Sequence, residues 1–190
     1  MTREDKRSLR RCLRAARRAV GAGERAAAAR AIDRALARLG LPRPGTRIAA
    51  YLPFDGEIDP SLILRRARAQ GCRIHVPVVT SLRHRRMRFM PLADDGRPAP
   101  TGAIAPRWLD LVLVPLVGFD AEGHRLGMGA ALYDRHFAFL GLRRAWTRPR
   151  LLGLAFEVQR VPRLPVEAHD VPLWGIVTEH GIYGRAAGAR

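Results

Sequence analysis

Apolar positions near the start of the chain recur every three to four residues, which predicts two helices. The first runs from Thr2 to about Val20 and the second from about Glu24 to Leu39. Thr2 is a candidate N-cap, and glycines follow both helices. We expect these helices, at about residues 3–39, to pack on the domain that the rest of the chain forms.

The rest of the chain alternates short apolar strands with helices. Residues 111–114 are an uninterrupted apolar run, which is typical of a strand in the middle of a parallel sheet. This order predicts one α/β domain over residues 1–190, in which helices cover both faces of a mainly parallel sheet to give three layers. The other strands are predicted at 47–51, 73–78, 87–90, 151–155 and 175–178, with further helices at 59–70 and 130–140.

Length and composition suit a protein with a real core. The chain has 190 residues, of which 47% are hydrophobic. No apolar run approaches the roughly 20 residues that span a bilayer. Residues 1–18 are charged throughout and lack the apolar core of a signal peptide. We therefore expect a cytoplasmic monomer without a membrane partner.

Arginine dominates a formal net charge of +17. Such a charge raises nucleic-acid binding as a hypothesis. However, 33 of the 34 basic residues are arginine and asparagine is absent, which indicates a coding bias across the chain. Nucleic-acid binding is open but not favoured. The single lysine, Lys6, either survived by chance or stands where a compact cation must reach one phosphate oxygen.

The clearest local motif is the segment 125–134, RLGMGAALYD, between the buried strand and a predicted helix. Its glycines let backbone N–H groups approach an anion, and a helix N-terminus adds partial positive charge. Arg125 is placed to pair with phosphate. The spacing matches neither a P-loop nor the dinucleotide-binding fingerprint, so the motif by itself indicates only an anion-binding loop.

Three carboxylates lie where strands end. Asp134 follows the glycine loop and Asp170 precedes the last predicted strand. Carboxylates beside bound phosphates commonly hold Mg²⁺. Glu57 follows the first strand and is placed to accept N–H bonds from a polar heterocycle. Each residue also has an ordinary surface role as an alternative. The histidines show no zinc spacing and no catalytic-triad order.

Taken in order, these stretches resemble the 5-formyltetrahydrofolate cyclo-ligase family. The resemblance implies a three-layer α/β fold related to the sugar-phosphate isomerase and CoA-transferase group. It also implies a reaction in which ATP and Mg²⁺ turn 5-formyltetrahydrofolate into 5,10-methenyltetrahydrofolate, ADP and phosphate. The matching segments span almost the whole chain: Lys6–Arg10, Tyr51–Pro53 with Glu57, Asp110–Pro115, Arg125–Gly129, Tyr133–Arg135, Gly153–Gln159, His169–Asp170 and Thr178–Glu179.

The resemblance implies roles for individual residues. Lys6 and Arg125 are the expected catalytic cations, and Asp134 and Asp170 the expected magnesium ligands. The expected ATP contacts are Lys6, Arg7, Ser8, Leu9, Arg10, Arg125, Leu126, Gly127, Met128, Gly129, Ala130, Ala131, Leu132 and Tyr133. The expected folate contacts are Leu52, Glu57, Met128, Gly129, Ala130, Ala131 and Leu132.

The glycine loop also departs from the family's pattern. Ala131 stands in place of a third glycine and Leu132 in place of an aromatic residue. Two alternatives therefore stay open. One is a non-catalytic homologue that binds RNA or another polyanion through its arginines. The other is a related ATP-dependent enzyme that acts on a different small heterocycle.

Overall fold

A computed structural model describes residues 3–142, 148–167 and 170–188. Its main sheet has seven strands in the order β3-β2-β1-β4-β7-β8-β9. The five inner strands are parallel, and β3 and β9 pair antiparallel at the two edges. The predicted α/β fold with a mainly parallel sheet is confirmed. The strands are β1 (Arg47–Ala49), β2 (Arg73–Ser81), β3 (Arg86–Pro91), β4 (Leu111–Pro115), β7 (Arg150–Leu154), β8 (Gly175–Val177) and β9 (Ile182–Tyr183), with β5 (Gly118–Phe119) and β6 (Arg125–Leu126) in a separate hairpin.

Four α-helices surround the sheet, and short 3-10 helices complete the connections. Acidic residues in the first turn of α1 and basic residues in its last turn complement the helix dipole. Glu24 accepts a hydrogen bond from the Gly21 N–H at 2.9 Å, which fixes the start of α2. The helices are α1 (Arg3–Ala19), α2 (Ala22–Arg38), α3 (Ser61–Ala69) and α4 (Leu132–Phe137), with 3-10 turns at Pro106–Trp108, Ala138–Leu142, Glu157–Gln159 and Gly184–Gly188.

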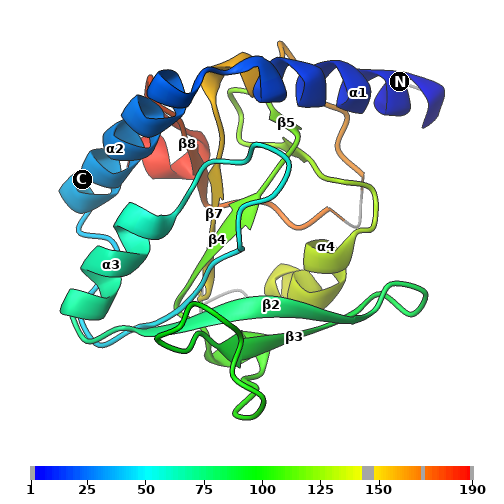
Figure 1. Cartoon of the computed structure of the whole chain (residues 1–190). Helices are drawn as coiled ribbons and strands as arrows, with labels where there is room; N and C mark the ends of the chain where they lie inside the picture. Colours follow the sequence, from blue (N-terminus) through cyan, green and yellow to red (C-terminus); the bar gives the residue numbers. More distant parts are fainter. Residues whose placement is uncertain (1–2, 143–147, 168–169, 189–190) are drawn as a thin grey trace.

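Alternation along β4 divides the core into two layers. Leu111 and Leu113 join a cluster with Ile32 and Leu36 of α2 and with residues of α3. Val112 and Val114 point to the opposite face and join a cluster that includes Phe137 of α4. Burying each of these side chains contributes about 1.5–3 kcal/mol. Figure 1 shows α2 and α3 on one side of β4 and β7, with α4 on the other, as the three-layer prediction requires.

Helix α1 crosses the carboxyl ends of the central strands rather than covering a face (Figure 1). Leu13 packs with Val117, which follows β4, with Leu126 of β6 and with Leu164. Most other side chains of α1 are exposed or half-buried, and many are arginines. The helix therefore brings its charged side chains to the edge where ligands of parallel sheets bind.

The structure corrects some predicted boundaries. The predicted helix at 130–140 begins at Leu132 and becomes a 3-10 helix from Ala138, since Ala131 has left-handed backbone angles. The hairpin of β5 and β6 and the edge strand β9 were not predicted. The predicted cap Thr2 lies outside the described residues. Within the described ranges, no helix combines the length and apolar character that a membrane crossing requires.

Candidate active site

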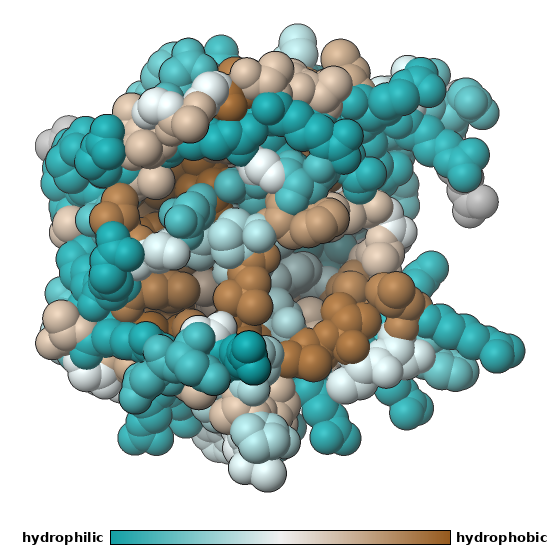
Figure 2. All heavy atoms as spheres, viewed as in Figure 1, coloured by the Kyte–Doolittle hydropathy of each residue, from teal (hydrophilic) through white to brown (hydrophobic). Residues whose placement is uncertain are grey.

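A cleft of about 710 Å³ opens at the carboxyl end of the sheet. Its walls are the N-terminal half of α1, the glycine loop with the start of α4, and the residues Leu164, Pro165, Glu167 and Asp170. Figure 2 shows hydrophilic side chains along α1 and hydrophobic residues on the hollowed face beneath it. Residues predicted from the sequence that line this cleft are Lys6, Arg7, Arg10, Arg125, Leu126, Gly127, Gly129, Ala131, Asp134 and Asp170.

The glycine loop joins β6 to α4 and is fastened to α1. Arg10 donates from Nε to the carbonyl oxygen of Gly127 at 2.8 Å. Gly129 is exposed and has a φ of +101°, a backbone conformation that side chains rarely allow. Ala131 takes the left-handed conformation with φ 49° and ψ 31°, where an alanine is strained by about 1–2 kcal/mol. The loop thus keeps the shape of a glycine turn although it carries an alanine.

Arg125 and Asp134 form the floor of the cleft. Arg125 donates to the Asp134 carboxylate and also to the carbonyl oxygen of Val171, the latter at 2.6 Å. The Val171 N–H donates back to Oδ1 of Asp134 at 3.1 Å. Asp170 accepts from the Glu167 N–H at 2.8 Å. These bonds hold the two predicted metal carboxylates in one cleft, on adjoining segments.

The two carboxylates fit a magnesium ion by their chemistry. Mg²⁺ prefers hard oxygen donors and usually takes one or two carboxylates, with water and substrate phosphates completing the octahedron. Asp134 and Asp170 both line the cleft beside the glycine loop, where such phosphates would lie. A separate group, Asp120, Glu122 and His124, has closely spaced ligand atoms, but His124 and the Leu164 N–H already donate to the buried Asp120.

Lys6 reaches across the mouth of the cleft. Its ammonium pairs with Glu167, and its side chain is 16% exposed. Ser8, by contrast, is exposed and does not line the cleft, and Leu9 packs on the apolar cluster around Leu13. Of the predicted ATP residues on this part of α1, Lys6, Arg7 and Arg10 therefore line the cleft. Ser8 and Leu9 do not.

Two of the predicted folate residues, Leu52 and Glu57, lie on the loop that follows β1. Leu52 is 50% exposed, whereas the Glu57 side chain is only 6% exposed. Burial raises the pKa of Glu57, and the Phe54 N–H and Arg17 counteract this by favouring its charged form. Burial also raises the pKa of Tyr133, and the charge of nearby Glu57 raises it further. The charge of Glu57 thus acts on Tyr133 at the start of α4, although Glu57 does not line the main cleft.

The remaining loop residues divide in the same way. Met128 is 45% exposed and lines a second groove of about 510 Å³ beside α1. Leu132 and Tyr133 pack against the apolar cluster of α4, and Tyr133 stacks on Phe137 with ring centroids 6.3 Å apart. Leu132 therefore turns its side chain toward the core.

Three residues near the site were not predicted from the sequence. Arg85, in the β2–β3 turn, lines the cleft opposite α1 and has a φ of +50°. No sequence signal marks it, because the length of that hairpin was not apparent. Glu167 stands three residues before Asp170, so the same motif could have included it. Arg17 falls four residues after Leu13 on the buried side of α1, a position where helical spacing expects an apolar residue.

The sequence profile of one known protein family matches almost the whole chain. The profile of the 5-formyltetrahydrofolate cyclo-ligase family matches residues 2–179. The chain belongs to this family.

Curated relatives and solved structures agree with the family assignment. The 5-formyltetrahydrofolate cyclo-ligase of Haemophilus influenzae is 31% identical over 149 residues, which are 71% of this chain and 76% of the relative. The Escherichia coli K12 enzyme of the same name is 30% identical over 153 residues, covering 72% and 79%. A 5,10-methenyltetrahydrofolate synthetase structure from Mycoplasma pneumoniae superposes with a TM-score of 0.76 at 25% identity, covering 92% of this chain and 99% of that one.

Proposed function

We propose that the protein is an ATP- and Mg²⁺-dependent 5-formyltetrahydrofolate cyclo-ligase. It would convert 5-formyltetrahydrofolate to 5,10-methenyltetrahydrofolate, with release of ADP and phosphate. Besides the family, the observation that carries this proposal is the joint placement of Lys6, Arg125, Asp134 and Asp170 around one cleft. Two cations and two carboxylates beside a glycine loop suit a nucleoside triphosphate with its metal ion.

The cleft would hold the nucleotide. Lys6, Arg7 and Arg10 on α1 would contact its phosphates from one wall, and Arg125 from the floor. Backbone N–H groups of residues 126–131 would complete the phosphate contacts. Within the proposed ATP set, Ser8 is placed to contribute only from the rim, and Leu9, Leu132 and Tyr133 through packing.

Asp134 and Asp170 would hold Mg²⁺ between them and the phosphates. The ion would neutralise charge that develops on the transferred phosphoryl group. In the free protein, Asp134 pairs with Arg125 and Lys6 pairs with Glu167. The phosphates would thus replace Glu167 as the partner of Lys6, and the ion would replace Arg125 as the partner of Asp134.

The folate would occupy the side of the glycine loop that faces Glu57. The Glu57 carboxylate would accept N–H bonds from the pterin, and Leu52 would cover it. Met128, Gly129, Ala130 and Ala131 would border both ligands, since Gly129 lines both the cleft and the groove beside α1, Met128 lines the groove and Ala131 lines the cleft. In this arrangement the formyl group would lie next to the end of the nucleotide.

The chemistry needs positioning more than a reactive side chain. The formyl oxygen attacks the γ-phosphorus and ADP leaves with the electrons of the broken P–O bond. N10 then attacks the activated formyl carbon and loses its proton. The C–O bond breaks toward oxygen, phosphate leaves, and the nitrogens share the remaining positive charge. Both nitrogens belong to one bound molecule, so proximity favours ring closure, and Lys6 and Arg125 would orient the phosphoryl group.

A turnover assay tests this proposal. Purified protein, Mg-ATP and 5-formyltetrahydrofolate should produce the absorbance of the methenyl product, and omission of ATP or chelation of Mg²⁺ should abolish it. Lack of product from folded protein would contradict the proposal. A matched sample of the Asp134→Asn variant, which keeps the shape of the side chain, should show the loss that removal of a metal ligand causes.

The arginine groove beside α1 supports a second candidate function, the binding of RNA or another polyanion without catalysis. Five arginines line this groove of about 510 Å³: Arg7, Arg10, Arg11, Arg14 and Arg18. Tight RNA binding with a steep salt dependence, together with absence of turnover, would favour this function over the enzyme.

The monomeric state and cytoplasmic location stay predictions, which sedimentation and localisation experiments would test.

A further inference from the structure

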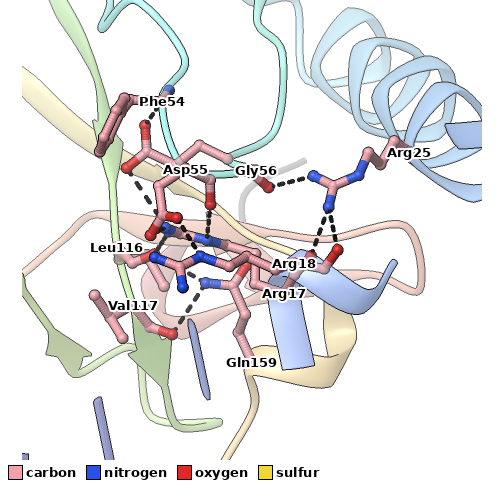
Figure 3. Close-up of polar contacts among 10 residues, drawn as sticks. Arg17, Arg18, Arg25, Phe54, Asp55, Gly56, Leu116, Val117 and Gln159 are labelled. Atoms are coloured by element: carbon pink, nitrogen blue, oxygen red, sulfur yellow. Dashed lines mark hydrogen bonds and ion pairs between the residues drawn. The ribbon is translucent and has the colours of Figure 1, made fainter. Parts of the chain in front are cut away.

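One buried arginine ties α1 to the ends of two sheet strands. The Arg17 side chain is 1% exposed, so its charge must be compensated within the protein. It donates from Nη2 to the Asp55 carboxylate at 2.9 Å and from Nε to the Asp55 carbonyl oxygen at 3.1 Å. Its Nη1 lies 3.3 Å from the carbonyl oxygen of Leu116, just past β4 (Figure 3). Arg17 therefore connects the helix to the loop after β1 and to the end of β4.

The same guanidinium contacts Glu57. Arg17 Nη1 lies 3.7 Å from Oε1 of Glu57, and the Phe54 N–H donates to Oε2 at 3.1 Å. One carboxylate oxygen is thus held from α1 and the other from the loop itself. The direction in which Glu57 points depends on both contacts.

A second arginine holds the same turn by different means. Asp55 and Gly56 both have positive φ, at 54° and 77°. Arg25 donates to the Gly56 carbonyl oxygen at 2.7 Å and to the Arg17 carbonyl oxygen at 2.9 Å (Figure 3). The positive φ of Gly56 favours glycine there, and a Cβ on residue 56 would also lie 2.8 Å from Arg25 Nη1. Arg25 donates to the backbone of this turn, whereas Arg17 contacts both its backbone and its carboxylates.

The charges around Glu57 come from several elements. Burial raises its pKa most, and Asp55 raises it further, while the Phe54 N–H, Arg17 and Arg14 lower it. The phenols of Tyr51 and Tyr133 also feel the Glu57 charge, which adds to the rise that burial causes in their pKa values. Of the two arginines, Arg17 is the one within ion-pair distance. Loss of its charge should therefore raise the pKa of Glu57 further.

We infer that Arg17 is a positioning residue for substrate binding, which fixes the Glu57 carboxylate at the carboxyl end of β1. The inference rests on the proposed role of Glu57 in holding the folate. Because α1 also carries Lys6 and Arg10 into the nucleotide cleft, the same helix aligns the two halves of the site. Removal of the Arg17 contact should thus weaken folate binding more than it changes ATP use.

Two variants and one matched control test this role. Arg17→Met removes charge and hydrogen bonds, and Arg17→Lys keeps the charge but loses the planar fork. Arg25→Met is the control, since it weakens the same turn through the backbone. Two readouts are measured: the KM values for 5-formyltetrahydrofolate and ATP, and the titration midpoint of Glu57. The midpoint comes from ¹³C NMR of glutamate-labelled protein, with Glu57→Gln identifying the signal.

Arg17→Met should raise the folate KM about tenfold or more, because the loop loses its charged hydrogen bond to Asp55 and Glu57 loses its ion pair. It should also move the Glu57 midpoint upward and leave the ATP KM nearly unchanged. Arg17→Lys should fall between this variant and the wild type. Arg25→Met should lower the melting temperature and leave both the folate KM and the Glu57 midpoint close to the wild-type values.

Folded Arg17→Met with an unchanged folate KM and an unchanged Glu57 midpoint would overturn the inference. If Arg17→Met does not fold, Arg17→Lys decides, and behaviour identical to that of Arg25→Met in both readouts would overturn it. A wild-type protein without turnover would refute the proposed function instead. The NMR titration would still show whether Arg17 controls Glu57, so the two failures are distinguishable.

Discussion

The two halves of the site differ in how their charges are held. On the nucleotide side, the Lys6–Glu167 and Arg125–Asp134 pairs border an open cleft of about 710 Å³. On the folate side, Glu57 is almost fully buried and faces the buried Arg17. The Glu167 side chain is 48% exposed, and ion pairs at the surface contribute about 0–1 kcal/mol, whereas the Arg125 and Asp134 side chains are only 8% and 17% exposed. Removing Arg17 would take a charged partner from both Asp55 and Glu57, and the loss of a buried partner of this kind is destabilising by about 3–5 kcal/mol. We therefore expect the Lys6–Glu167 pair, on the proposed nucleotide side, to exchange charge partners more readily than the Arg17–Glu57 pair on the proposed folate side.

The largest effect is expected for Arg125→Lys, on the proposed nucleotide side. Arg125 spans Asp134 and the Val171 carbonyl oxygen with its fork, whereas a lysine reaches one acceptor at a time. We expect kcat/KM to fall about 10²-fold or more, as when a charge-stabilising donor is removed. Steady-state kinetics measures this, with Arg135→Lys on the exposed face of α4 as control. Equal kinetics for both variants would show that the fork is dispensable.

Lys6→Arg should produce the next largest effect. The broad guanidinium would not reproduce the contact that a compact ammonium makes with one phosphate oxygen. We expect kcat/KM for ATP to fall about tenfold, with a smaller change for the folate. Arg30→Lys, on the exposed face of α2, is the control for a change between the two cations elsewhere. Unchanged ATP kinetics would mean that the single lysine survived by chance.

The same comparison shows how much the sequence could predict. Lys6, Arg125, Asp134 and Asp170 stand in local motifs, and the cleft brings them together as expected. The parallel order of the sheet followed from apolar runs such as β4. Local pattern is sufficient where a motif carries both the residue and its loop.

The folate side was harder to predict, because its structure depends on contacts between distant segments. Arg17 meets Asp55 and Leu116, which lie 38 and 99 residues away in sequence. A pattern of apolar spacing gives no reason to bury an arginine. Strands β5 and β6, of two residues each, are too short for periodicity, and Arg85 reaches the cleft only because the β2–β3 hairpin is long.

Ala131→Gly should sharpen the comparison by removing strain from the loop between the two sides. Alanine at φ 49° is strained by about 1–2 kcal/mol, and glycine at this position would remove the strain. Part of this gain in stability is offset, because glycine has more conformational freedom in the unfolded chain. We expect the variant to be about 1 kcal/mol more stable, seen as a melting temperature about 2–4 °C higher. Ala130→Gly, at a neighbouring position without positive φ, should lose stability instead. A loss in both variants would contradict the strain.

Glu57→Gln should give the smallest effect, a pH-dependent change in stability. Burial raises the pKa of Glu57, so the folded protein binds this proton more tightly than the unfolded chain. Stability is then greatest below the unfolded pKa and is lost as pH rises through the folded pKa. The variant should match the wild type near ~pH 3.5 and be more stable at neutral pH, by urea denaturation. Glu122→Gln, on an exposed turn, is the control. Lower stability of Glu57→Gln at neutral pH would show that the Arg17 contact outweighs burial.

The two sides of the proposed site are expected to bring the γ-phosphate of ATP to the formyl oxygen of the folate. Turnover of 5-formyltetrahydrofolate labelled with ¹⁸O in the formyl group tests this most directly. If the formyl oxygen attacks phosphorus, the label must leave in inorganic phosphate, which mass spectrometry detects. We predict one ¹⁸O atom per phosphate released. Methenyl product formed with the label in water, and none in phosphate, would contradict the account.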